Sequence, residues 1–216
     1  MGEGIDAIHL VLSLTALVLL PLLLMITTCF LKIAVVLVIV RNAIGVQQAP
    51  PTMALYAIAL SLSLLVMAPG FAQIGERMQE LDLMEMHPET AVDTLRDTAE
   101  PLQHFMKAHT DPELQQMFKG AASQLWPEEM MVDVAKDDFL ILIPAFVVSE
   151  LQTAFELGFL LYVPFLVIDL IISSLLLSLG MMMVAPMMVS LPLKILLFVL
   201  VDGWGLLLQG LVLSYA

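Results

Sequence analysis

The residues with the most distinctive chemistry are a block of methionines between two long apolar runs. The stretch GMMMVAPMMVSLP, residues 180–192, holds five methionines in the eight positions 181–188, and Pro186 interrupts it. Thioether sulfur is a soft ligand that selects Cu(I), but three consecutive residues cannot all face one ion from a helix, and no Cys or His lies near. The same flexible side chains can fill gaps in a core or form a hydrophobic constriction that closes a pore by dewetting. The pattern leaves core filling and a pore seal as the two open interpretations.

Charged residues in or beside apolar runs form a second group. They are Lys32, Glu150, Glu156, Asp169, Lys194 and Asp202. In the last apolar run, helical spacing predicts one helix face that carries Lys194, Phe198, Asp202, Gly205 and Gln209. Carboxylates in a membrane can relay protons or ions, or they can make polar contacts between helices. We favour contacts, because small and polar residues are the usual packing devices there and one lysine with two aspartates does not define a path.

The sequence predicts no enzyme, no cofactor and no metal site. His104 and His109 are five residues apart, the wrong spacing for one helix face, and His87 is remote from both. There is no CxxC or HExxH motif for zinc, no GxSxG motif around a serine and no glycine-rich phosphate loop. Cys29 is the only cysteine, so no intrachain disulfide can form.

The composition is that of a membrane protein. Of the 216 residues, 60% are hydrophobic and 13% charged, and the mean hydropathy is +0.97, whereas soluble domains carry about 25% charged residues. The net charge of −13 offers no basic surface for nucleic acid. The N-terminus, MGEGID, lacks the basic n-region of a signal peptide, so we expect no cleaved signal.

The chain divides by composition into three regions, and the fold class that they predict is all-α. Apolar helices, with a kink allowed at Pro21, occupy residues 1–75. An acidic segment of amphipathic helices follows at 76–138, with 15 acidic and 5 basic residues; Asp111-Pro112-Glu113 is a helix start signal within it. An apolar helical hairpin then fills 139–216, and its turn is the methionine block at 181–188.

The predicted orientation depends on one basic residue. Arg41 lies in the only short loop that carries a positive charge, which places residues 41–52 in the cytoplasm and residues 76–138 outside. Four simple spans nevertheless fit poorly, because a charge at mid-membrane costs about 2.5–3.5 kcal/mol on insertion scales. The six charges in apolar runs therefore favour a buried protein interface over lipid.

Four stretches together resemble one protein family: RNAIGVQQAPP at 41–51, PAFVVSELQTAFELGFLLYVPFLVIDLIISSLLLSLGMMM at 144–183, SLPLKILLFVLVDGW at 190–204 and, more loosely, QHFMKAHTDPELQQMF at 103–118. The family is FliP/SctR, the P/R component of the type III secretion export apparatus. Because we expect no signal peptide, the chain looks more similar to the injectisome branch than to the flagellar one. Gln152 departs from the Lys or Arg that the family usually carries there.

The resemblance implies an all-helical subunit without enzymatic activity that forms a ring of five copies with the S and T components, and contacts the U switch component. The ring would be a helical cone at the periplasmic side of the bacterial inner membrane, with a channel for unfolded secreted proteins. The methionine loop, residues 181–188, would close that channel through Met181, Met182 and Met183, with support from Met187 and Met188. The residues implied in subunit contacts are Lys32, Arg41, Glu150, Glu156, Asp169, Lys194 and Asp202.

A conventional membrane transporter or ion channel with four spans is the alternative. In it, Asp169, Lys194 and Asp202 would form a polar path through the membrane, as intramembrane ionisable residues often do. The native mass of the extracted protein distinguishes the two, since the ring is a pentamer and the transporter a monomer or dimer.

Overall fold

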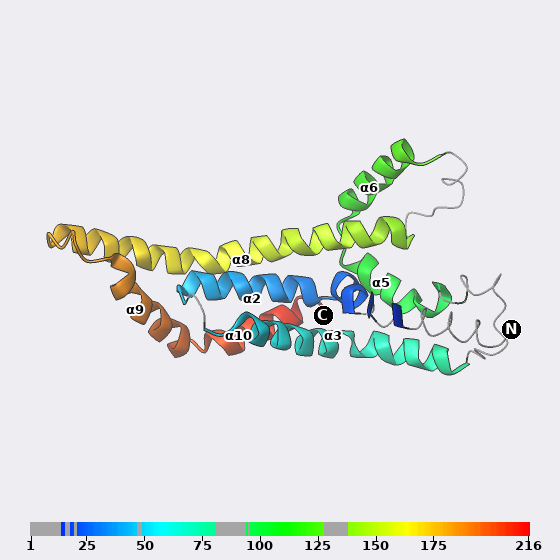
Figure 1. Ribbon diagram of the computed structural model, residues 1–216, viewed down its shortest axis with the longest axis horizontal. Helices are drawn as coiled ribbons and strands as arrows, with labels where there is room; N and C mark the ends of the chain where they lie inside the picture. The colour runs from blue at the N-terminus through cyan, green and yellow to red at the C-terminus, as the bar shows by residue number, and fades with distance from the viewer. Residues whose placement is uncertain are drawn as a thin grey trace. The chain divides into compact units, whose positions relative to one another are not determined.

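The computed structural model describes residues 14–15, 18–19, 21–46, 49–80, 94, 96–127 and 138–216. Every regular element in these ranges is helical (Figure 1), and none of the described residues is in a strand. The predicted all-α class is confirmed; the ring and cone stay a prediction. His87, the N-terminal MGEGID and much of the acidic segment lie outside the described residues. The main helices are α2 (Phe30–Ile44), α3 (Thr52–Glu80), α5 (Glu100–Ala108), α6 (Pro112–Leu125), α8 (Phe139–Ser178), α9 (Pro186–Leu200) and α10 (Gly203–Leu213).

Two compact units make up the described chain, and they do not follow the order of the sequence. One contains the described residues up to Leu31 together with Met67–Ser149. The other contains Lys32–Val66 and Glu150–Ala216. Helices α3 and α8 therefore each contribute to both units. The three regions predicted from composition stay a prediction, as does the side of the membrane that each of them faces.

The first unit is held by a small apolar core between α5 and the start of α8. Met106, Leu142 and Phe146 are buried in it, and the rings of Phe105 and Phe146 meet edge to face with centroids 6.1 Å apart. The predicted start of α6 is confirmed, because the Asp111 carboxylate accepts a hydrogen bond of 2.8 Å from the Glu113 N–H. This cap satisfies one of the free donors at the helix end.

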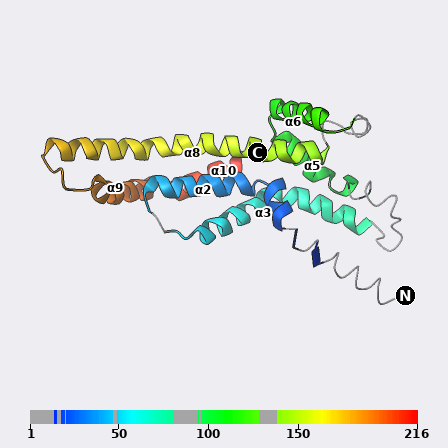
Figure 2. The ribbon, with the colours of Figure 1, turned by 45° about the horizontal axis from the view of Figure 1, so that its top comes forward.

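In the second unit, α2 runs parallel to the later part of α8, and α9 and α10 return antiparallel to it. Figures 1 and 2 both show this reversal at the orange end of α8. Along α2, Lys32 pairs with Glu150, and Ile39 packs against Gly158. A Cβ atom on Gly158 would lie 2.5 Å from the Ile39 Cδ1 atom, so glycine is what allows the two helices to approach so closely.

Within the described residues, two helices are long and apolar enough to cross a membrane, and two further pairs would do so if each bent pair is one span. The single helices are Thr52–Gln79 and Phe139–Ser178. The pair Pro186–Leu200 and Gly203–Leu213 is bent by 62°. The other pair breaks at Thr28 and Cys29. The Thr27 hydroxyl donates to the Leu23 carbonyl at 2.7 Å, a bond that commonly bends helices.

Candidate functional site

The methionine loop is joined to α8 by a well-defined helix end. Gly180 has φ +74°, its N–H donates to the Leu177 carbonyl at 3.1 Å, and the Met181 N–H donates to the Leu176 carbonyl at 2.9 Å. These two bonds around a left-handed glycine form a Schellman motif, which satisfies carbonyls that would otherwise be free. The chain therefore leaves the helix at a fixed place and in a fixed direction.

The other end of the loop is set by a proline. Pro186 is the first residue of α9, where its missing N–H costs nothing and its fixed φ suits the helix. Between the two ends, the Val184 N–H closes a turn onto the Met181 carbonyl at 3.3 Å. The predicted loop at 181–188 is therefore shorter, because Met187 and Met188 lie in α9. The helices hold a short turn at 181–185 that projects apolar side chains.

The methionine side chains of this loop are exposed in the single chain. Met183 is fully exposed and Met182 is 80% exposed, and the other three methionines of the loop are at least 45% exposed. Met67 and Met106, by contrast, are 2% and 0% exposed. The loop methionines therefore do not fill the core of this chain.

Lys194, on α9, is buried and makes an ion pair with the half-exposed Asp169. Its Nζ atom donates to the Asp169 carboxylate at 2.6 Å and to the Ala43 carbonyl at 3.1 Å. Lys194 is 5% exposed, and the three residues come from α9, α8 and α2. The pair neutralises a charge that would be costly alone in an apolar setting and connects the three helices at one level.

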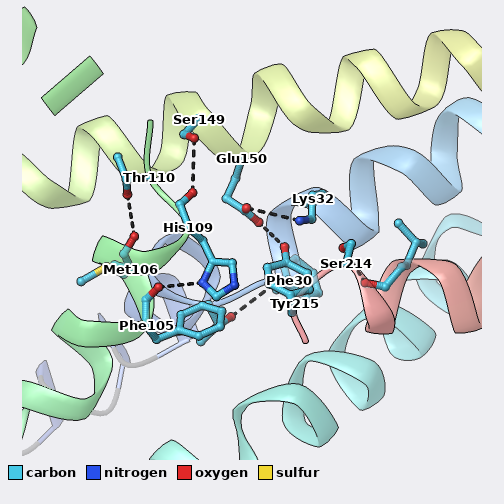
Figure 3. Close-up of polar contacts among 12 residues, drawn as sticks. Phe30, Lys32, Phe105, Met106, His109, Thr110, Ser149, Glu150, Ser214 and Tyr215 are labelled. Carbon is cyan, nitrogen blue, oxygen red and sulfur yellow. Dashed lines mark hydrogen bonds and ion pairs between the residues drawn. The ribbon is translucent and has the colours of Figure 1, made fainter. Parts of the chain in front are cut away.

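A second cluster contains Lys32, Glu150 and Tyr215, whose contacts Figure 3 shows. The Lys32 Nζ atom is 3.5 Å from the Glu150 carboxylate, and both residues are almost fully buried. The Tyr215 hydroxyl donates to the second Glu150 oxygen, while the Lys32 Nζ atom lies 3.5 Å from the centroid of the Tyr215 ring. The cluster connects α2, α8 and the residues after α10.

Tyr215 was not singled out from the sequence. The signal that could have found it is a lone phenol at the end of an apolar run, because a buried tyrosine hydroxyl usually has a hydrogen-bond partner.

Three other predicted residues lie apart from these clusters. The Arg41 Nη1 atom donates to the Thr52 hydroxyl at 2.9 Å and holds the loop between α2 and α3. Glu156 is exposed on α8, and its carboxylate has no ion pair within the described part of the chain. Asp202 is also exposed, at the break between α9 and α10.

The single polar face predicted for the last apolar run is wrong. The run is two helices, because Asp202 has the left-handed φ of 51° and the chain bends there. Gly203 is required at the bend, since a Cβ atom on it would collide with the Phe198 ring. Lys194 and Phe198 are buried on α9, whereas Gly205 and Gln209 are exposed on α10.

An apolar cavity of about 270 Å³ adjoins this bend. Phe165 and Phe198 line it with their rings tilted to each other, and the Phe198 ring also meets Trp204 edge to face with centroids 5.3 Å apart. A lining of this kind offers packing surface and no group for acid–base chemistry.

The chain has the features of a helical membrane protein. Its helices are long and apolar, two pairs of them are bent, charged residues in it pair with one another, and an apolar turn is exposed. The sequence profile of the FliP family matches residues 13–211. The chain therefore belongs to the FliP family, and its relatives place it in the SctR branch of the injectisome.

Three relatives align over nearly their whole length. Harpin secretion protein HrcR of Erwinia amylovora is 52% identical over 215 residues, which are 99% of this chain and 98% of that protein. Yop proteins translocation protein R of Yersinia pestis is 48% identical over 211 residues, 97% of each chain. Virulence protein YscR of Salmonella typhimurium is 44% identical over 197 residues, 91% of each chain. The first two names describe secretion and translocation, the third describes virulence, and none describes an enzyme.

Proposed function

We propose that this protein is a pore-forming core subunit of the type III protein export gate in the bacterial inner membrane. Five copies assemble into a ring with the S and T components and contact the U component. Unfolded secreted proteins pass through the ring, and Met181, Met182 and Met183 seal it between passages. The proposal is supported by membership of the FliP family and by relatives named for secretion and translocation.

The observation that carries the sealing role is the exposure of the methionine loop. The flexible side chains of Met181, Met182 and Met183 project from a turn that a Schellman motif and a helix-starting proline hold in place, and Met187 and Met188 follow in the first turn of α9. A soluble surface would not place them there, because contiguous exposed apolar side chains mark interaction sites. Methionines from five copies that meet on one axis exclude water, and their three rotatable bonds let the seal deform around unlike cargo.

The charged residues divide into two groups in this proposal. Lys32, Glu150, Asp169 and Lys194 stabilise the helix arrangement of each copy and border the subunit contacts. Glu156 and Asp202 are exposed on apolar helices, so they find polar partners on neighbouring subunits, which avoids the cost of a lone carboxylate in lipid.

The orientation follows from the loop charges. Residues 41–52, with Arg41, face the cytoplasm, and residues 76–138 lie on the periplasmic side, where most of the assembled complex sits. The methionine loop would then seal the channel within the assembled ring.

Replacement of Met181, Met182 and Met183 by alanine tests the sealing role. Alanine is too short to meet its neighbours across the channel, so water re-enters the constriction. We expect complexes in normal yield with raised ion conductance in planar bilayers. Met53→Ala is the matched control, because Met53 is exposed outside the loop and its loss leaves the conductance low.

Two results would contradict the sealing role. Normal assembly without added conductance would place the gate elsewhere. Scarce complexes would mean that the side chains are buried in packing, since each fully buried methionine lost to alanine costs about 2–5 kcal/mol.

A further inference from the structure

We propose that the methionine loop is a site of reversible oxidation, at which a peroxide converts the thioethers to sulfoxides and opens the seal to water. The inference rests on the proposed function, because only a loop that closes a channel would convert oxidation into conductance. The target is the cluster Met181, Met182, Met183, Met187 and Met188.

Exposure makes these five methionines the most concentrated group of accessible thioethers in the described part of the chain. Met182 and Met183 present most or all of their side-chain surface, while Met67 and Met106 are buried. Susceptibility to oxidation follows exposure. Hydrogen peroxide is as small as the ions that the seal excludes, so it reaches the loop from the channel water on either side of the constriction.

The chemistry is a balanced transfer of one oxygen atom. A thioether sulfur attacks hydrogen peroxide, the O–O bond breaks, and an S–O bond forms. The sulfur is oxidised by two electrons, and the peroxide is reduced to water. Methionine sulfoxide reductases reverse the step with electrons from a thiol, one enzyme for each sulfoxide epimer.

The composition of the loop makes the seal sensitive to the oxidation of a methionine. Residues 179–189, LGMMMVAPMMV, contain no charged side chain and no side chain that forms ordinary hydrogen bonds. The seal therefore depends on dewetting alone. Each sulfoxide adds a strong hydrogen-bond acceptor and makes a flexible apolar side chain polar. With five copies around one axis, even partial oxidation gives water a continuous polar path.

The test uses the assembled complex in liposomes, treated with hydrogen peroxide. Peptide mass spectrometry follows each methionine, and we expect Met182 and Met183 to oxidise about tenfold faster than Met67 and Met106. Ion conductance should rise as the loop is oxidised. Treatment with methionine sulfoxide reductases A and B and dithiothreitol should return it to the starting value.

Two variants serve as controls. The substitution of Met181, Met182, Met183, Met187 and Met188 by leucine keeps apolar volume at small cost and removes every sulfur of the cluster, so this channel should stay closed in peroxide. Met117→Leu removes an exposed methionine of α6 and should keep the full response. Complex yield is measured for both.

The outcomes distinguish a failure of this inference from a failure of the proposed gate function. In one outcome, peroxide oxidises the loop without raising the conductance, while the alanine variant does conduct. That result would overturn the inference and would agree with the proposed sealing role of the loop. Loop methionines that react no faster than Met67 would also overturn it. If neither alanine nor peroxide opens the channel, the proposed function fails.

Discussion

Tyr215 is the residue whose contacts most directly connect the end of the chain to its buried charges. A charged pair such as Lys32 and Glu150 is expensive to bury, and the remaining oxygen of the carboxylate needs its own donor. The Tyr215 hydroxyl supplies that donor, and its ring lies under the Lys32 ammonium. Tyr215, which follows α10, therefore completes a cluster whose other members lie on α2 and α8.

Tyr215→Phe removes the hydroxyl and keeps the ring. We expect it to lower the free energy of unfolding by about 1–3 kcal/mol, because a buried carboxylate loses its donor while the cation–π contact remains. Thermal unfolding in detergent, followed by circular dichroism, measures the change. Tyr162→Phe is the control, since Tyr162 is exposed on α8. This variant should unfold at the same temperature as the parent protein. An equal effect of both substitutions would contradict the role of the cluster.

At the scale of elements, the break between α9 and α10 decides where polar residues of the last run point. Asp202 adopts a left-handed conformation that costs most L-residues roughly 1–2 kcal/mol and that Asn, Asp and Gly accept most readily. Gly203 leaves room for the Phe198 ring, which packs against Trp204 at the bend. The break therefore buries Lys194 and leaves the Asp202 carboxylate available to a neighbouring subunit.

Substitutions of Asp202 separate the backbone role from the proposed contact. Asp202→Gly accepts the left-handed conformation but removes the carboxylate, so we expect a folded chain with a lower yield of rings. Asp202→Asn keeps the conformation and a hydrogen-bonding group, so ring yield should be partly retained. Size-exclusion chromatography after mild extraction measures ring yield, and circular dichroism measures folding. Full ring yield with Asp202→Gly would show that no subunit uses this carboxylate.

At the scale of the whole molecule, the single chain leaves much apolar surface uncovered. Large exposed apolar side chains lie on every helix long enough to span a membrane, among them Phe155, Phe159 and Leu170 of α8. Lipid, neighbouring subunits or both must cover this surface. The proposed ring assigns part of it to subunit contacts, where Glu156 on the same helix also finds a partner.

Native mass spectrometry tests the assembly. After extraction in a mild detergent, with the S and T components co-expressed, we expect a species with five copies of this chain. The replacement Glu156→Gln keeps the size of the side chain and removes its charge, so it should reduce that species if the carboxylate lies at a contact. A population of monomers or dimers alone, with the partners present, would favour a conventional transporter.

The sequence by itself determined the all-α class, the position of the methionine loop and the residues whose charges needed partners. Those features depend on composition, proline and glycine signals, and the cost of charge in an apolar setting, which are all local. Only the tertiary structure decided which charges pair, because the partners are far apart in the chain: Lys194 binds the Ala43 carbonyl 151 residues away, and Tyr215 binds Glu150 65 residues away. It also decided the break at Asp202, which apolar periodicity cannot reveal in a run that is hydrophobic on all sides. In such helices steric fit, as between Gly158 and Ile39, selects the faces that pack.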